Sequence, residues 1–399
     1  MRASRGPASG NFDRATLSVG DCRARVRDSC VLLVLSVLVG CGSSHGAAFP
    51  RAMNAADDAA EHGDLREAAR RFDMAARVAL LPHDRDEARH AAARLLGRAG
   101  DVHGALTRLD ALANEAQPGA EAGSAFYDAA SLRLSSGDDD TGWRAVEAML
   151  HRFPNDGDGR PALHRWLAHL DDTAGASASL AWLRRIQPEL DGTDRAEEVA
   201  YEIAVRLSET QDLVAARTAF LAVAARWPYP QGALWDDALY HASAIDEAIG
   251  HPREAAADLT EMLERRERAI IVGSSERARY ADAELHLGEL YRDRLGDHEA
   301  ARRAFHALFT AFPESPIRDR GLFEEAELLR ADGDLTSACA RLATLVETVP
   351  DSRYAPCAVS RCPSLHLKPG PGAPRTCHGY IERTGAEGGG RGATPPATR

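Results

Sequence analysis

Two short motifs in this sequence begin like metal sites. His298 and Glu299 open the pattern of a zinc-binding helix, in which a second histidine stands four residues after the first. That position holds Arg302, so the second ligand is absent. Asp156 and Asp158, separated by a glycine, resemble the opening of a calcium loop, but no glutamate closes a twelve-residue window. The sequence therefore predicts no metal ion at either motif.

The other polar residues do not form the set of acid, base and nucleophile that an active site needs. The chain has 15 histidines, and they are scattered, mostly over segments with a helical pattern. Structural or solvated roles account for them better than metal binding does. We therefore expect no catalytic residues, no cofactor and a protein that is not an enzyme.

Four cysteines near the C-terminus carry a different kind of chemistry. In an oxidising compartment they would form two disulfides that fix the end of the chain to the last helical segment, with three pairings open. Zinc is the alternative, held by three of these cysteines and His378, but the spacing fits the usual zinc knuckles poorly. Free thiols are a further alternative, and we favour disulfides. The cysteines are Cys339, Cys357, Cys362 and Cys377.

Another cysteine, Cys41, follows a short apolar segment. Residues 31–39 are uncharged and fall well short of the roughly twenty residues of a membrane-spanning helix. Three arginines precede this segment, and Leu-Val-Gly stands directly before Cys41. This order resembles the signal peptide and lipobox of bacterial lipoproteins. The alternative is an ordinary secretory signal with a cysteine near the cleavage site.

The lipoprotein resemblance implies a signal peptide at residues 1–40, lipidation of Cys41 and a short tether at residues 41–49. Several acyl chains on one residue hold a protein to a bilayer far better than one chain does. Gly42, rather than Asp, follows the cysteine, and by the same resemblance this implies the outer membrane. We therefore expect an outer-membrane lipoprotein that faces the periplasm.

Composition limits the fold and the partners. Between residues 50 and 350 the chain is rich in Ala, Leu, Arg and Glu, which favour helices, and it has no strand-like alternation of Val, Ile and Thr. The predicted class is all-α. The formal net charge of −12 excludes the basic surface that nucleic-acid binding needs.

One pattern recurs about every 36 to 39 residues, with one longer interval. A Gly-Asp pair is followed by a small residue five positions after the glycine and a large apolar residue nine positions after it. Glycine would end one helix in a left-handed turn, and aspartate would cap the next. The clear copies start at Gly63, Gly100, Gly250, Gly296 and Gly333, with variants at Gly137, Gly175 and Gln211.

The segment around one copy resembles a tetratricopeptide repeat. Leu287, Gly288 and Tyr291 match its first helix, and Ala301 and Phe305 match its second, with one extra residue at the turn. The next copy matches through Pro350. The resemblance implies a right-handed α-solenoid of about eight helix-turn-helix repeats over residues 50–356.

The junctions at Phe312-Pro313 and Val349-Pro350 resemble those of outer-membrane repeat lipoproteins. That group includes the BamD-like subunit of the β-barrel assembly machine and the Tol-Pal-associated coordinator of envelope constriction. The members are adaptors. About eight repeats exceed the five or so of the barrel-assembly subunit, so the likeness is to the group and not to one member.

The resemblance implies a membrane-anchored adaptor that binds envelope proteins in a groove lined by the first helix of each repeat. Carried over position by position, the candidate groove residues are Glu289, Arg292, Asp293, Glu327 and Arg330. Solvated charges at these positions are the alternative. The lipid bilayer is the second expected partner, and nucleic acid is excluded. Two other functions remain open: a structural lipoprotein that contacts the cell wall, or a non-catalytic subunit of a cell-wall enzyme.

The helical pattern stops near Pro356. Residues 357–399 are rich in Gly, Pro and Arg, a composition typical of disorder. We therefore expect a disordered tail that contains three of the four C-terminal cysteines.

Overall fold

The computed structural model describes residues 46–266, 278–367, 374–379 and 381. Within these residues, no helix is both long and apolar enough to cross a membrane. The predicted signal peptide and Cys41 lie outside the described residues, so their processing stays a prediction.

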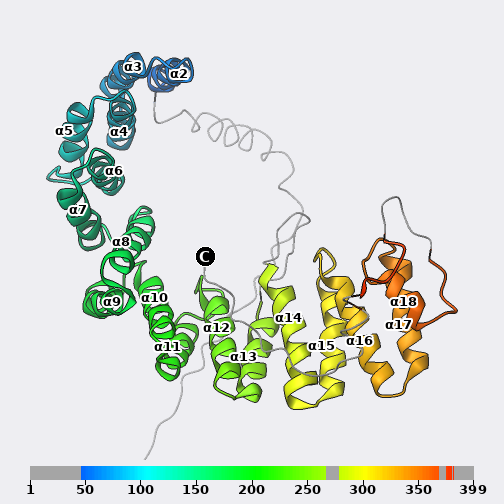
Figure 1. Ribbon diagram of the computed structural model, residues 1–399. Coiled ribbons are helices and arrows are strands. Elements are labelled where there is room, and N and C mark those ends of the chain that lie inside the picture. Colours follow the sequence, from blue (N-terminus) through cyan, green and yellow to red (C-terminus); the bar gives the residue numbers. More distant parts are fainter. Residues whose placement is uncertain (1–45, 267–277, 368–373, 380, 382–399) are drawn as a thin grey trace, which may run out of the picture. The chain divides into compact units, whose positions relative to one another are not determined.

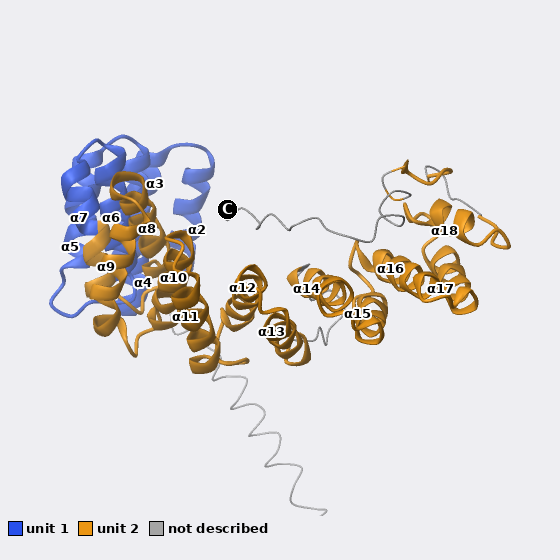
Figure 2. Ribbon diagram, turned by 60° about the horizontal axis from the view of Figure 1, so that its bottom comes forward, with its two compact units in different colours: residues 1–145 blue, residues 146–399 orange. Residues whose placement is uncertain are grey.

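All regular elements of the described residues are helical, which confirms the predicted all-α solenoid. Within each unit, most helices pack mainly against the helices before and after them in the sequence (Figure 1). The chain divides into two compact units, residues 1–145 and 146–399 (Figure 2). The described helices form eight pairs followed by a short final helix.

Unit 1 contains α2 (Ala48–Glu61), α3 (Leu65–Val78), α4 (Pro82–Arg98), α5 (Val102–Ala113) and α6 (Ala122–Ser135). The boundary between the units falls within α7 (Asp139–Arg152). Unit 2 contains α8 (Gly159–Ala174), α9 (Ala176–Leu190), α10 (Ala196–Glu209), α11 (Leu213–Arg226), α12 (Trp235–Ala248), α13 (Pro252–Glu264), α14 (Ala278–Leu290), the π-helical turn η1 (Tyr291–Leu295), α15 (His298–Ala311), α16 (Arg318–Ala331), α17 (Leu335–Thr348) and α18 (Ala355–Arg361).

The turns within the pairs have the predicted chemistry. Gly63 and Gly333 have φ of +81° and +86°, a left-handed conformation that glycine adopts without steric penalty. The aspartates that follow, Asp64 and Asp334, accept hydrogen bonds from backbone amides three residues later and so cap the next helix. Gln211, the one described non-glycine residue with positive φ, replaces glycine at the same position.

The core of each pair is built from the predicted small and large residues. The alanines five positions after the turn glycine, among them Ala68, Ala255 and Ala338, are fully buried. The large residues nine positions after it, such as Phe305 and Leu342, are also fully buried. The small residues let two helices approach closely, and the large residues fill the space between them.

The extra residue of the seventh repeat lies in η1. In the eighth repeat the Asp334 amide donates to the carbonyl of Leu329, five residues earlier. In the seventh, the Asp297 amide donates to the carbonyl of Tyr291, six residues earlier. A π-helical turn accommodates one inserted residue within a helix, so the insertion is absorbed before the second helix begins.

The C-terminal end differs from the prediction. Helix α18 crosses the expected boundary between residues 356 and 357, and Cys357, Cys362 and Ile381 are buried against α16 and α17. The expected tail therefore begins too early, because these described residues are packed. The Pro- and Gly-rich composition of residues 357–399 led to a prediction of disorder that overlooked a seven-residue helix. The apolar side of this helix packs on the last repeat.

Candidate partner-binding face

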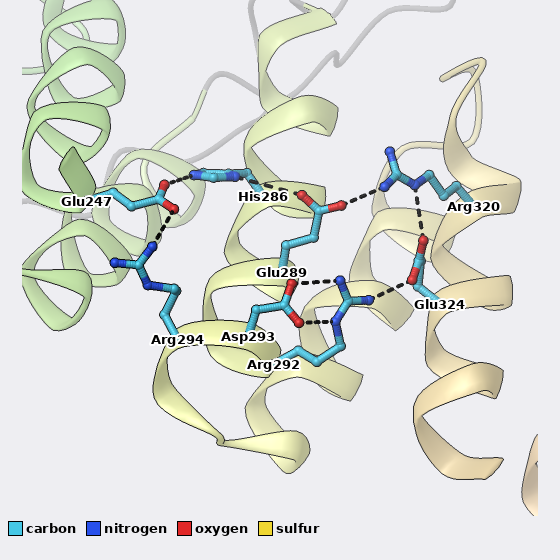
Figure 3. Close-up of polar contacts among 8 residues, drawn as sticks. All are labelled: Glu247, His286, Glu289, Arg292, Asp293, Arg294, Arg320 and Glu324. Atoms are coloured by element: carbon cyan, nitrogen blue, oxygen red, sulfur yellow. Dashed lines mark hydrogen bonds and ion pairs between the residues drawn. The ribbon is translucent and has the colours of Figure 1, made fainter. Parts of the chain in front are cut away.

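Charged side chains from three neighbouring first helices of unit 2 form one connected network (Figure 3). The helices are α12, α14 with its η1 extension, and α16. The network contains Glu247, His286, Glu289, Arg292, Asp293, Arg294, Arg320 and Glu324. We call it the first-helix network.

Two glutamates lie on either side of His286. Its Nε2 is 2.8 Å from a carboxylate oxygen of Glu247 on α12. Its Nδ1 is 3.9 Å from a carboxylate oxygen of Glu289, which stands three residues later on α14. Arg294, in η1, also approaches Glu247, at 3.8 Å. The histidine and the arginine thus connect the seventh repeat to the sixth.

The same repeat is connected to the eighth by two arginines. Arg320 on α16 donates to Glu289 at 2.6 Å, and it also pairs with Glu324 at 3.2 Å. In the other direction, Arg292 in η1 donates to Glu324 at 2.6 Å and holds Asp293 through two nitrogens. The inserted π-helical turn therefore supplies cations to both neighbouring first helices.

Partial burial makes these charges interact more strongly than exposed pairs do. The side chains of Arg292 and Glu324 are 27% and 18% exposed. Burial alone would raise the pKa of Glu289, but His286, Arg320 and Arg292 outweigh it and lower that pKa. Glu289 and Glu247 raise the pKa of His286 although burial opposes them. The network therefore favours the deprotonated carboxylate of Glu289 and the protonated imidazole of His286.

The structure places the five predicted groove residues in two groups. Glu289, Arg292 and Asp293 belong to the first-helix network. Glu327 and Arg330 lie on α16, where Arg361 of α18 pairs with Glu327 at 3.1 Å and Arg330 donates to the Arg361 carbonyl at 3.1 Å. All five have polar partners within the chain, and Asp293 is at the same time 55% exposed. Their role in binding a partner stays a prediction.

Sequence reasoning missed the partners of these residues. Glu247, Arg320, Glu324 and Arg361 were not singled out, although each lies about one repeat from an oppositely charged partner. The signal is the sequence separation, which runs from 31 to 39 residues across the interrepeat pairs Arg320–Glu289, Arg292–Glu324, Arg361–Glu327 and His286–Glu247. A search for opposite charges at the repeat period would have found them.

Aromatic side chains extend this face toward the preceding repeats. Tyr201 on α10 and Tyr240 on α12 occupy equivalent positions one repeat apart. Tyr201 contacts Phe220 and His241 edge to face, and burial raises its pKa to about 12. The guanidinium of Arg279 lies over the Tyr240 ring. The face therefore combines half-buried aromatic rings with paired charges.

The C-terminal cysteines form two disulfides in the structure. Cys339 of α17 is joined to Cys362, and Cys357 of α18 to Cys377, with Cα–Cα distances of 5.7 and 4.5 Å. In this arrangement each of the four sulfurs is bonded to one other sulfur, so none of these cysteines has a thiolate to bind zinc.

The two dismissed metal motifs have local structural roles. Asp156 accepts a hydrogen bond from the backbone amide of Asp158 at 2.9 Å, which stabilises a turn. His298 hydrogen-bonds to Asp332 at 2.5 Å. A different group, His83, Asp84 and Glu87, has ligand atoms within 4.8 Å of one another. Glu87 is exposed and His83 pairs with Asp84 at 2.9 Å in the first turn of α4.

A cavity of about 750 Å³ lies between α13 and η1. Tyr291 and Leu295 of η1 line one side, and Arg253, Glu261 and Arg265 of α13 line the other. Its wide opening and mixed charge give no basis for assigning a ligand.

Comparison with known proteins identifies the repeat. Residues 282–315 match the model of the tetratricopeptide repeat family, and no curated protein matches the chain. Among solved structures, the C-terminal part of a tetratricopeptide-repeat protein from Cytophaga hutchinsonii is similar at 14% identity, with a TM-score of 0.41, over 68% of this chain and 99% of that one. Pseudomonas aeruginosa pilF is similar at 15% identity, with a TM-score of 0.35, over 59% of this chain and 95% of that one. The chain is thus an all-α protein of paired helices that contains a tetratricopeptide repeat.

Proposed function

We propose that this chain is a membrane-anchored adaptor of the bacterial cell envelope, which binds protein partners on the first-helix face of unit 2. The observation that carries the proposal is the repeat itself. The tetratricopeptide fold is typical of protein-binding scaffolds and is generally non-catalytic. Its first helices here present aromatic rings and charges over several consecutive repeats.

The paired charges suit a partner that binds as an extended segment or a helix. Charged groups of such a partner would form ion pairs with network residues that are already paired within the chain. The new pairs would replace existing ones, so they would contribute more to specificity than to affinity. Tyr240 and Tyr201 supply the contact area that usually contributes most to affinity.

Anchoring and the envelope location are supported by the sequence around Cys41, which has the order of a lipoprotein signal. The proposal covers adaptors of barrel assembly, division, pilus or secretion machinery. Replacing Cys41 with Ser is expected to release a folded protein from the membrane fraction. Continued membrane association of that variant would contradict the anchor.

Site-specific photo-cross-linking tests the binding face. A photoreactive amino acid replaces Asp293, whose side chain is 55% exposed on the first-helix face, or Glu299, which is 76% exposed at the start of α15. We expect cross-links to an envelope protein from position 293 and few from position 299. Equal cross-linking from both positions, or none from either, would contradict this face.

The identity of the cross-linked partner separates the remaining functions. A component of an assembly machine supports the adaptor. Peptidoglycan would instead favour a structural link to the cell wall, and a hydrolase would favour a non-catalytic subunit of a cell-wall enzyme.

A further inference from the structure

Unit 1 has an exposed apolar cluster at the end of α3. The side chains of Met74, Val78 and Leu80 are 59%, 40% and 71% exposed. They are three of the five large hydrophobic residues that are exposed in the described part of the chain; the other two, Val214 and Leu335, lie singly on α11 and α17. An apolar cluster of this kind marks a contact surface more often than scattered hydrophobic residues do.

Arginines accompany the apolar side chains on the same stripe of α3. Arg66, Arg70 and Arg77 are exposed and stand at helical spacing from Met74. Arg70 is neutralised by Glu67 at 2.6 Å. No ion pair among the described residues involves Arg66 or Arg77. Exposed apolar residues flanked by arginines are typical of a helix that lies on a lipid surface.

The cluster lies where the chain enters the folded array. A Cβ added to Gly46 would lie 3.0 Å from Cδ1 of Leu80, so the start of the described chain touches this residue. Cys41 stands five positions before Gly46 in the sequence. Even fully extended, five residues span at most about 17 Å, so a lipid attached to Cys41 would hold this cluster close to the bilayer.

We propose that Met74, Val78 and Leu80 insert into the lipid surface next to the anchored N-terminus, while Arg66 and Arg77 contact anionic headgroups. The proposal rests on the lipidation of Cys41 and goes beyond it. An acyl anchor alone leaves the protein free to rotate about its tether, whereas a second contact fixes which side of unit 1 faces the membrane.

A fluorescent probe on an introduced cysteine tests this contact. The probe is NBD, attached to Leu80→Cys in the full lipidated chain. Val214→Cys, 68% exposed in unit 2, is the matched control. The four C-terminal cysteines are paired in disulfides, which leaves the introduced thiol for labelling. Circular dichroism checks that both variants fold.

The labelled proteins are reconstituted into vesicles of phosphatidylcholine and phosphatidylglycerol, with or without bromine on the acyl chains near the headgroup. We expect the probe at position 80 to shift to the blue and to lose at least half of its emission to bromine. The probe at position 214 is expected to lose almost none. Replacing Met74 and Val78 with Ser should reduce the quenching at position 80 several-fold.

Each other outcome overturns the proposal in a distinguishable way. If the wild-type chain does not float with the vesicles, both the anchor and the lipid contact are wrong. If it floats and the probe at position 80 behaves like the one at position 214, the lipid contact alone is wrong. A blue shift without bromine quenching would show that protein covers the cluster, either the chain's own N-terminal residues or a second copy.

Discussion

Two junctions between repeats of unit 2 are held by different forces. The junction between the seventh and eighth repeats packs α15 against α16 and also carries the first-helix network, in which half-buried charges pair across repeats. The end of the array, where α18 packs on α16 and α17, depends on apolar burial and two disulfides. We therefore expect the first junction to respond to pH and salt, and the second to respond to a reductant. The same fold thus contains one junction between repeats that includes ion pairs and one end that is covalently cross-linked.

The largest expected effect comes from removing a disulfide. The bonds close loops with sequence separations of 23 and 20 residues, for which loss of chain-entropy stabilisation amounts to about 3 kcal/mol each. In Cys339→Ser, hydrogen–deuterium exchange of α17 and α18 should accelerate about 100-fold, while α14 stays unchanged. Equal acceleration in both regions would mean that the two junctions are not independent.

A smaller loss is expected from the packing beneath the first-helix network. A Cβ on Gly288 would overlap the ring of Phe305, which is fully buried. Gly288→Ala should therefore destabilise unit 2 by about 2 kcal/mol in urea unfolding, since overpacking forces backbone shifts. Gly157→Ala, whose Cβ would meet nothing within 4 Å, is the control. A difference of less than about 0.5 kcal/mol between the two variants would argue against close packing here.

Breaking the network itself should have a lesser effect. Arg292→Met leaves Glu324 without its closest cation and should cost about 1–2 kcal/mol. In a double-mutant cycle with Glu324→Gln, the coupling should be about 1 kcal/mol. Arg303→Met removes an exposed pair with Glu299, 65% and 76% exposed, and should change stability very little. Coupling as weak as in that control would show that the network does not join the repeats.

The smallest expected effect is a pH dependence of the same junction. Because the folded-state pKa of His286 is raised, its stabilisation is complete below its unfolded pKa, near 6.5, and is lost as pH rises through the folded pKa. Glu284, whose pKa burial raises to about 7, acts in the same direction from about pH 4.5 to 7. His241 opposes them, since burial lowers its pKa.

Urea unfolding at pH 5.5 and 8 measures this dependence. His286→Gln should reduce the loss of stability between the two values, and His103→Gln, which removes an exposed histidine in unit 1, should not. A wild-type protein that is more stable at pH 8 than at pH 5.5 would show that other groups outweigh this junction.

The sequence predicts the repeated parts of this molecule well because each turn has its own local chemistry. A glycine that must adopt positive φ and an aspartate that must cap a helix are visible one residue at a time, as at Gly333 and Asp334. The partners of Glu289 and Arg292 were not predicted, because each lies about one repeat away in the sequence, and only a comparison of charges at the repeat period brings the two together. Helix α18 was missed because its stability comes from burial and disulfides and not from helix propensity.

The π-helical turn η1 also bears on how such an array can change in length. With its one extra residue, the amide of Asp297 bonds to the sixth preceding carbonyl where that of Asp334 bonds to the fifth, and Ala301 and Phe305 still reach their places in the core. The insertion at the end of α14 therefore leaves the register of the eighth repeat intact. We infer that the end of a first helix is a position where such an array tolerates an added residue, and where a new charged side chain can join the first-helix network without rebuilding the repeats.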